Sequence, residues 1–180
     1  MPGVPEPLPT VLYVCHGHPE TRPGGAEVYA WELFQAARVA GEVRPVFLAR
    51  EDTVAVDGPP RPHPTHADCF LAPFDVRNYD FFAHELRDAT VYHRWLGPLI
   101  RRLNPQVVHF QHTFAMGYEL VALVKEWVPG VKVVYTLHEF HPVCHHGGQM
   151  FTTWNRKPCP AASPDACHKC FPDISAFAFQ

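Results

Sequence analysis

Histidine and cysteine offer most of the chemistry in this sequence. The 180-residue chain contains 13 histidines and 6 cysteines. Four cysteines follow one another in its last third: Cys144, Cys159, Cys167 and Cys170. The final two form a Cys-x-x-Cys pair, and with two more thiols upstream this spacing is typical of a tetrahedral zinc site. Zinc would offset the ordering entropy of a segment that has no apolar core. Free thiols and disulfides are the alternatives that the spacing leaves open.

Six further histidines lie where expected strands end: His16, His18, His109, His112, His138 and His141. The carboxyl ends of parallel strands meet at one edge of a sheet, so these side chains are expected to converge on one crevice. A neutral imidazole there can donate a hydrogen bond or move a proton near neutral pH. For any one of them, the alternative is an ordinary polar residue at a strand end.

The segment Gly24-Gly25-Ala26-Glu27 follows the first expected strand and opens a helix. Paired glycines let a ligand approach the backbone, and the N–H groups of a helix start favour phosphate. A flexible loop before an ordinary helix is the alternative. The carboxylates of Glu27 and Glu139 are candidates for binding sugar hydroxyls, although Glu27 also suits the first helical turn as a favourable charge.

Alternating apolar patterns predict the elements that position these residues. Strands are expected at 10–15, 43–49, 67–72, 106–110 and 132–137, and helices at 24–41, 80–103 and 115–127. Residues 51–66 are expected to form a loop, because prolines there exclude a regular element. The alternation predicts an α/β, Rossmann-like parallel sheet in the order 3-2-1-4-5, with helices on both faces. We expect a flexible 1–9, a domain over 10–140 and a Cys/His-rich metal-binding segment over 141–180.

Composition excludes several classes of protein. The formal net charge of -3 gives no basic field for nucleic acid. No apolar run approaches the roughly 20 residues of a membrane span. The first residues lack the basic and apolar regions of a signal peptide, which predicts a cytoplasmic, reducing location. Cys15 and Cys69 lie in apolar strands and are expected to be buried thiols.

Two long stretches resemble the N-terminal domain of family-four retaining glycosyltransferases, which have two Rossmann-like domains (the GT-B architecture). They read VLYVCHGHPETRPGGAEVYAWEL and VVHFQHTFAMGYELVALVKEWVPGVKVVYTLHEFHPVC. The trailing cysteines are similar to those of a subgroup that assembles surface polysaccharides. The resemblance implies transfer of a sugar from a nucleotide-diphosphate sugar to a glycan or lipid-linked acceptor. A lipid-linked acceptor would bring the protein into peripheral contact with the inner face of the membrane.

The resemblance also implies roles for individual residues. Gly24 and Gly25 would meet the donor diphosphate, and His138 would face the transferred sugar as the catalytic residue. The residues around them would be Glu27, His18, His112 and Glu139. In this family the donor nucleotide sits mainly in a C-terminal Rossmann domain, which does not follow within these 180 residues. The chain alone is therefore expected to fold but not to catalyse transfer.

Two other functions compete with this interpretation. The first is a zinc-containing Rossmann-like module that acts by binding alone. The second is a nucleotide-dependent oxidoreductase, in which Glu51 or Asp52 would bind the cofactor ribose. The absence of a third glycine from the loop argues against the oxidoreductase, because the dinucleotide fingerprint is Gly-x-Gly-x-x-Gly.

Overall fold

The computed structural model describes residues 6–51, 57–163, 165–175 and 177. The chain forms two compact units, Met1–Thr136 and Leu137–Gln180, whereas the sequence placed the domain boundary after Phe140. Residues 1–5 of the expected flexible terminus, and Asp52, lie outside the described residues. No described helix is long and apolar enough to cross a membrane.

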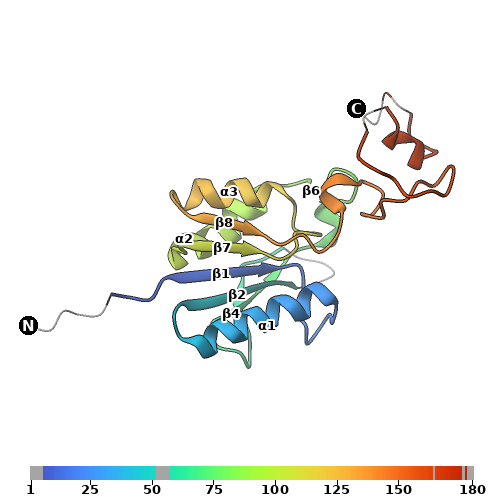
Figure 1. Cartoon of the computed structure of the whole chain (residues 1–180). Coiled ribbons are helices and arrows are strands. Elements are labelled where there is room, and N and C mark those ends of the chain that lie inside the picture. Colours follow the sequence, from blue (N-terminus) through green and yellow to red (C-terminus); the bar gives the residue numbers. More distant parts are fainter. Residues whose placement is uncertain (1–5, 52–56, 164, 176, 178–180) are drawn as a thin grey trace, which may run out of the picture. The chain divides into compact units, whose positions relative to one another are not determined.

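The first unit is built around a six-stranded sheet in the order β3-β4-β2-β1-β7-β8. Figure 1 shows its five parallel strands side by side. The strands are β1 (Thr10–Cys15), β2 (Arg44–Glu51), β3 (Arg61–Pro62), β4 (Cys69–Pro73), β7 (Val107–Phe110) and β8 (Lys132–Tyr135). The parallel strands stand in the predicted order 3-2-1-4-5. The α/β, Rossmann-like fold is therefore confirmed.

Helices cover both faces of this sheet. Alternate residues of a strand point to opposite sides, so one strand contributes apolar side chains to the layers on both faces. Leu12 and Val14 of β1 belong to a core with residues of α2 (Gly97–Leu103) and α3 (Glu119–Trp127). Tyr13 and Cys15 belong to a second core, with residues of α1 (Gly25–Ala40). Strand β1 is thus buried on both faces.

The sheet differs from the expected one at its edge. Arg61 and Pro62, expected in a loop, form the short strand β3, which pairs antiparallel with β4. Proline has no backbone N–H to donate. An edge strand tolerates it, because one side of that strand makes no hydrogen bonds within the sheet. The backbone N–H of His63 then donates to the carbonyl of Cys69 at 2.8 Å, which fixes the start of the following loop.

The expected helix over 80–103 is wrong in its first half. Tyr79–Asp80 (β5) and Glu85–Leu86 (β6) pair as a two-stranded sheet instead. The Asp80 carboxylate accepts hydrogen bonds from the N–H groups of Phe82 and Ala83 at 2.8 and 3.0 Å, which closes a tight turn. His84 then adopts φ 57°, which a continuing helix does not allow. The helical part consists of the π-helical turn η2 (Tyr92–Leu96) followed by α2.

Backbone geometry also sets two other helix ends. Helix α1 ends as expected at Gly41, which has φ 68° and donates its N–H to the carbonyl of Ala37. Helix α3 begins at Glu119 and not at 115, because Ala115 and Gly117 have φ 56° and 86°. A 3-10 turn, η1 (Val76–Asn78), precedes β5.

The second unit contains little regular structure. Its helical parts are the 3-10 turns η3 (His141–Val143) and η4 (Cys167–Cys170). Phe151 and Pro158 form an isolated bridge, and the N–H of Cys159 donates to the carbonyl of Met150 at 2.8 Å. Turns and backbone hydrogen bonds hold this unit together, and its side chains enclose a small cavity.

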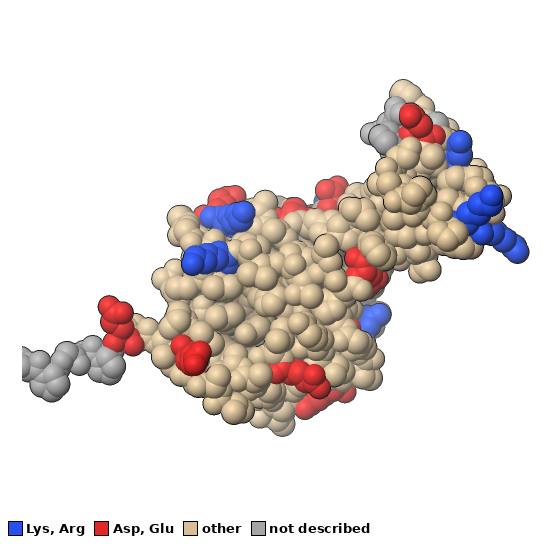
Figure 2. Space-filling model, in the orientation of Figure 1, with Lys and Arg blue, Asp and Glu red and all other residues tan. Residues whose placement is uncertain are grey.

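Charged side chains are scattered over the face of the molecule shown in Figure 2. Acidic and basic groups lie in small clusters on that face, with mostly uncharged surface between the clusters.

Burial of β1 on both faces predicts the cost of truncating it. Leu12 is fully buried, so Leu12→Ala should lower the free energy of unfolding by about 2–5 kcal/mol through lost packing and a residual cavity. Val39 on α1 is 89% exposed, and Val39→Ala should change it by no more than about 0.5 kcal/mol. Urea unfolding of both variants measures the difference. Equal effects would contradict the central position of β1.

Candidate functional site

The carboxyl ends of β1 and β7 bring two histidines together, as expected for neighbouring parallel strands. His16 follows β1 directly, and His112 lies two residues beyond β7. Their ring centroids are 4.5 Å apart. His112 is 5% exposed, and its Nδ1 accepts a hydrogen bond from the N–H of Phe114 at 2.9 Å. In the neutral ring, the proton of His112 therefore lies on Nε2.

Glu27 is bound to His16 at this edge of the sheet. The distance from Glu27 Oε1 to His16 Nε2 is 2.8 Å, and Glu27 is only 4% exposed. Burial works against ionisation of Glu27, but the hydrogen bond and charge of His16, with Arg22 nearby, hold its pKa below the ordinary value. Glu27 is thus a buried carboxylate that stays ionised.

The two glycines of the loop have different surroundings. A Cβ on Gly24 would lie 2.5 Å from Oε2 of Glu27, so the carboxylate occupies the place of a side chain there. A Cβ on Gly17 would also lie close to this carboxylate, 3.2 Å from Oε1. A Cβ on Gly25 would meet nothing within 4 Å. Gly24 therefore accommodates Glu27, while Gly25 leaves open space at the first position of α1.

His18 lies in a different environment from His16. It is fully buried, and its ring centroid is 4.7 Å from that of Trp31 and 5.9 Å from that of Phe47, on the side of the sheet covered by α1. His63 and His66 lie beside it. The sequence interpretation assigned these two histidines to a proline-rich loop and missed them. The His-Pro-Thr-His spacing was the signal in the sequence that could have identified them.

His138 and Glu139 belong to the second unit. The strand expected to reach residue 137 ends at Tyr135, so His138 lies in a bend and is half-buried. Glu139 is exposed, and its Oε2 lies 3.1 Å from Nε2 of His141. His141 begins the turn η3.

The four cysteines of the second unit are reduced and half-buried. All four line one cavity of about 40 Å³: Cys144, Cys159, Cys167 and Cys170. The N–H of Ser163 donates to Sγ of Cys167 at 3.1 Å. Among the described side chains, the sulfurs do not form a group of three within 4.8 Å of one another. The cavity thus gathers the predicted ligands without bringing them to coordination distance.

The other two cysteines are structural. Cys15 is fully buried and Cys69 is 1% exposed, which confirms the expectation of buried thiols. Burial raises the pKa of each thiol to about 12, so both stay protonated at neutral pH.

The fold and the carboxyl edge of its sheet define a class of protein. A doubly wound sheet carries a glycine loop and an open helix start beyond the carboxyl ends of its strands, where such sheets bind phosphorylated ligands. The family model described as Glycosyltransferase Family 4 matches residues 23–166, and the chain belongs to this family. Neither a curated protein nor a solved structure matches the chain.

The contact between Gly24 and Glu27 predicts different outcomes for two similar substitutions. Gly24→Ala should lower the free energy of unfolding by about 1–3 kcal/mol, because the new methyl group displaces a buried carboxylate held by His16. Gly25→Ala should be neutral or stabilising by about 0.5–1 kcal/mol, because alanine favours the helix. Urea unfolding of each variant measures these effects.

A third substitution provides the control. In a Glu27→Ala background the obstructing carboxylate is gone, so Gly24→Ala should no longer be destabilising. If Gly24→Ala costs the same in both backgrounds, the carboxylate does not set the requirement for glycine.

Proposed function

We propose that this chain is the acceptor-side half of a retaining glycosyltransferase. It would transfer a sugar from a nucleotide-diphosphate sugar to a glycan or lipid-linked acceptor, at the cytoplasmic face of the membrane in the lipid-linked case. Family membership over residues 23–166 supports the reaction class. The single Rossmann-like sheet of the described residues supports a half-enzyme, because the GT-B architecture has two such domains.

The observation that carries the proposal is the open space at Gly25. The first N–H groups of α1 have no partners within the helix and make a suitable site for a diphosphate. Because Gly25 has no side chain and no neighbour within 4 Å of a Cβ, phosphate oxygens can approach its backbone. Glu27 would act indirectly, by holding Gly24 and His16 in place rather than by touching the donor.

His138 is proposed as the catalytic residue that faces the transferred sugar, with Glu139 beside it in the sequence. A histidine there would stabilise the transition state by hydrogen bonding to the sugar. His112 remains a proposed neighbour of the donor, since it lies at the carboxyl edge with His16. His18 is fully buried, so it would support the loop and not contact substrate.

A zinc-containing binding module without catalysis is the second candidate function. The cavity shared by the four cysteines favours it, because a metal ion bound there would order the second unit. The two functions differ in one property: only the first includes transfer of sugar from a nucleotide donor.

Activity tests separate these functions. The isolated chain should show no transfer, because the charges that neutralise the leaving diphosphate lie in the donor-binding domain, and each such group typically contributes about 10²-fold or more. Joined to that domain, it should transfer sugar, and His138→Ala should lower kcat more than it changes KM. Gly25→Val should block donor binding by steric contact. Sustained turnover by the isolated chain, or full activity of His138→Ala, would contradict the proposal.

The cysteine cavity gives a separate prediction. The four thiolates should close around one zinc ion with Zn–S distances near 2.3 Å. Metal analysis should find about one zinc fewer per chain in Cys167→Ser than in the unmodified protein. Thr153→Ala, a change at an exposed residue of the same unit, should keep the full content. Mass spectrometry that finds disulfides among these cysteines in protein freshly purified under reducing conditions would refute the site.

A further inference from the structure

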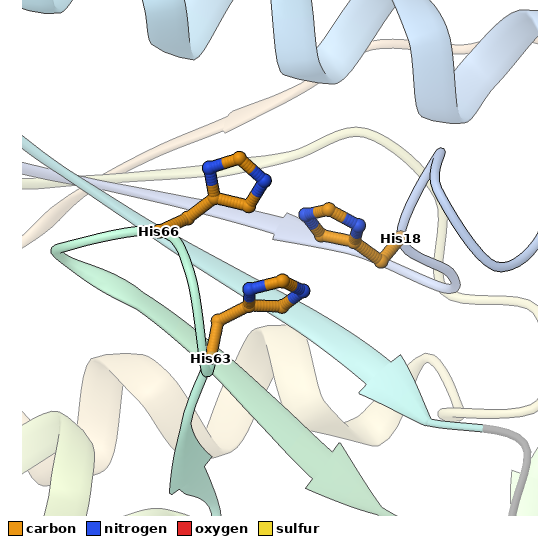
Figure 3. Close-up of side chains that lie close together, drawn as sticks. All are labelled: His18, His63 and His66. Carbon is orange, nitrogen blue, oxygen red and sulfur yellow. The ribbon is translucent and has the colours of Figure 1, made fainter.

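Three histidines of the first unit lie in contact at one point. His18 comes from the loop after β1, and His63 and His66 come from the loop between β3 and β4. Ring centroids lie 4.6 Å apart for His18 and His63, 4.7 Å for His63 and His66, and 5.6 Å for His18 and His66. One nitrogen from each ring lies within 4.8 Å of the other two. Figure 3 shows the three rings facing one another from two separate loops.

The buried member of this cluster has one ring nitrogen without a hydrogen-bond partner. His18 is fully buried, and its Nε2 makes no hydrogen bond. In Figure 3 one ring nitrogen of His18 points toward His66 and His63. A buried polar atom without a partner is costly, so such an atom indicates that a ligand belongs there.

A carboxylate lies beside two of these rings. Oε1 of Glu20 lies 2.5 Å from Nε2 of His66, and Oε2 lies 3.7 Å from Nε2 of His63. Three imidazoles and one carboxylate are a ligand set that zinc and related ions accept.

The backbone holds the loop of His63 and His66 in place. The N–H of His63 donates to Cys69 of β4, and Nδ1 of His63 contacts the N–H and hydroxyl of Thr65 at 3.3 and 3.2 Å. His18 Nδ1 lies 3.3 Å from the N–H of Glu20, a long contact. When Nε2 of His18 binds a metal, its proton moves to Nδ1 and this weak contact is exchanged for the metal bond.

We propose that His18, His63, His66 and Glu20 bind a divalent transition-metal ion of the zinc type. With metal–nitrogen distances of about 2.0–2.1 Å, ligand atoms must approach to roughly 3.3 Å of one another. The rings of His63 and His66 must therefore move closer to His18 when an ion binds. The ion joins the β1–α1 loop, which contains the glycines, to the loop after β3. The site does not depend on the glycosyltransferase proposal.

The test uses a chain in which the four second-unit cysteines are serine, so that thiolate binding is removed. Titration with Zn²⁺ or Co²⁺ should still show one ion bound per chain, and the ion should raise Tm. His63→Gln and His66→Gln should each weaken binding by at least about 100-fold, more than the loss typical of outer-shell changes. His93→Gln, at an exposed histidine of η2, is the matched control and should bind normally.

A second measurement keeps the test decisive if the cysteine-free chain does not fold. Cadmium NMR of the unmodified chain should then show a resonance from nitrogen and oxygen ligands, separate from any thiolate resonance. It should vanish in His66→Gln and persist in His93→Gln. No such resonance, no metal binding in a folded cysteine-free chain, or binding that His63→Gln and His66→Gln leave unchanged would overturn the proposed site.

Discussion

The buried pairing of Glu27 with His16 is the interaction on which the carboxyl edge of the sheet depends. A carboxylate that is 4% exposed must be balanced, and the imidazole at 2.8 Å does so. Its position then favours glycine at 24 and restricts side chains at 17, which accounts for these two glycines. Gly25 is different, because it is free of this constraint and leaves the helix start open.

The loop after β1 divides its two histidines between different environments. His16 contacts both Glu27 and His112, whereas His18, two residues later, is buried under α1. The loop of His63 and His66 is anchored to β4 by the backbone hydrogen bond between His63 and Cys69. A metal at His18 would therefore stabilise the same loop that presents the glycines, linking a structural site to the proposed donor site.

Local sequence patterns predicted the parallel core and its strand order, because apolar β-branched runs and right-handed crossovers leave few alternatives. They also predicted the end of α1 at Gly41 and the burial of Cys15 and Cys69. They failed where contacts far apart in the sequence decide the structure. The edge strand at 61–62 forms only by pairing with β4, and the Asp80 turn replaces a helix that periodicity alone favoured. The histidine cluster joins residues 18 and 66, which no local pattern could bring together.

The central claim is that the glycine loop binds the diphosphate of a nucleotide sugar. Backbone NMR of the labelled chain, titrated with a nucleotide-diphosphate sugar, tests it most directly. The account predicts that the largest amide shifts occur at Gly24, Gly25 and Ala26, around the open space at Gly25, and that Gly25→Val abolishes them. Saturating donor that leaves these three amides unshifted, or shifts that survive Gly25→Val, would contradict the claim.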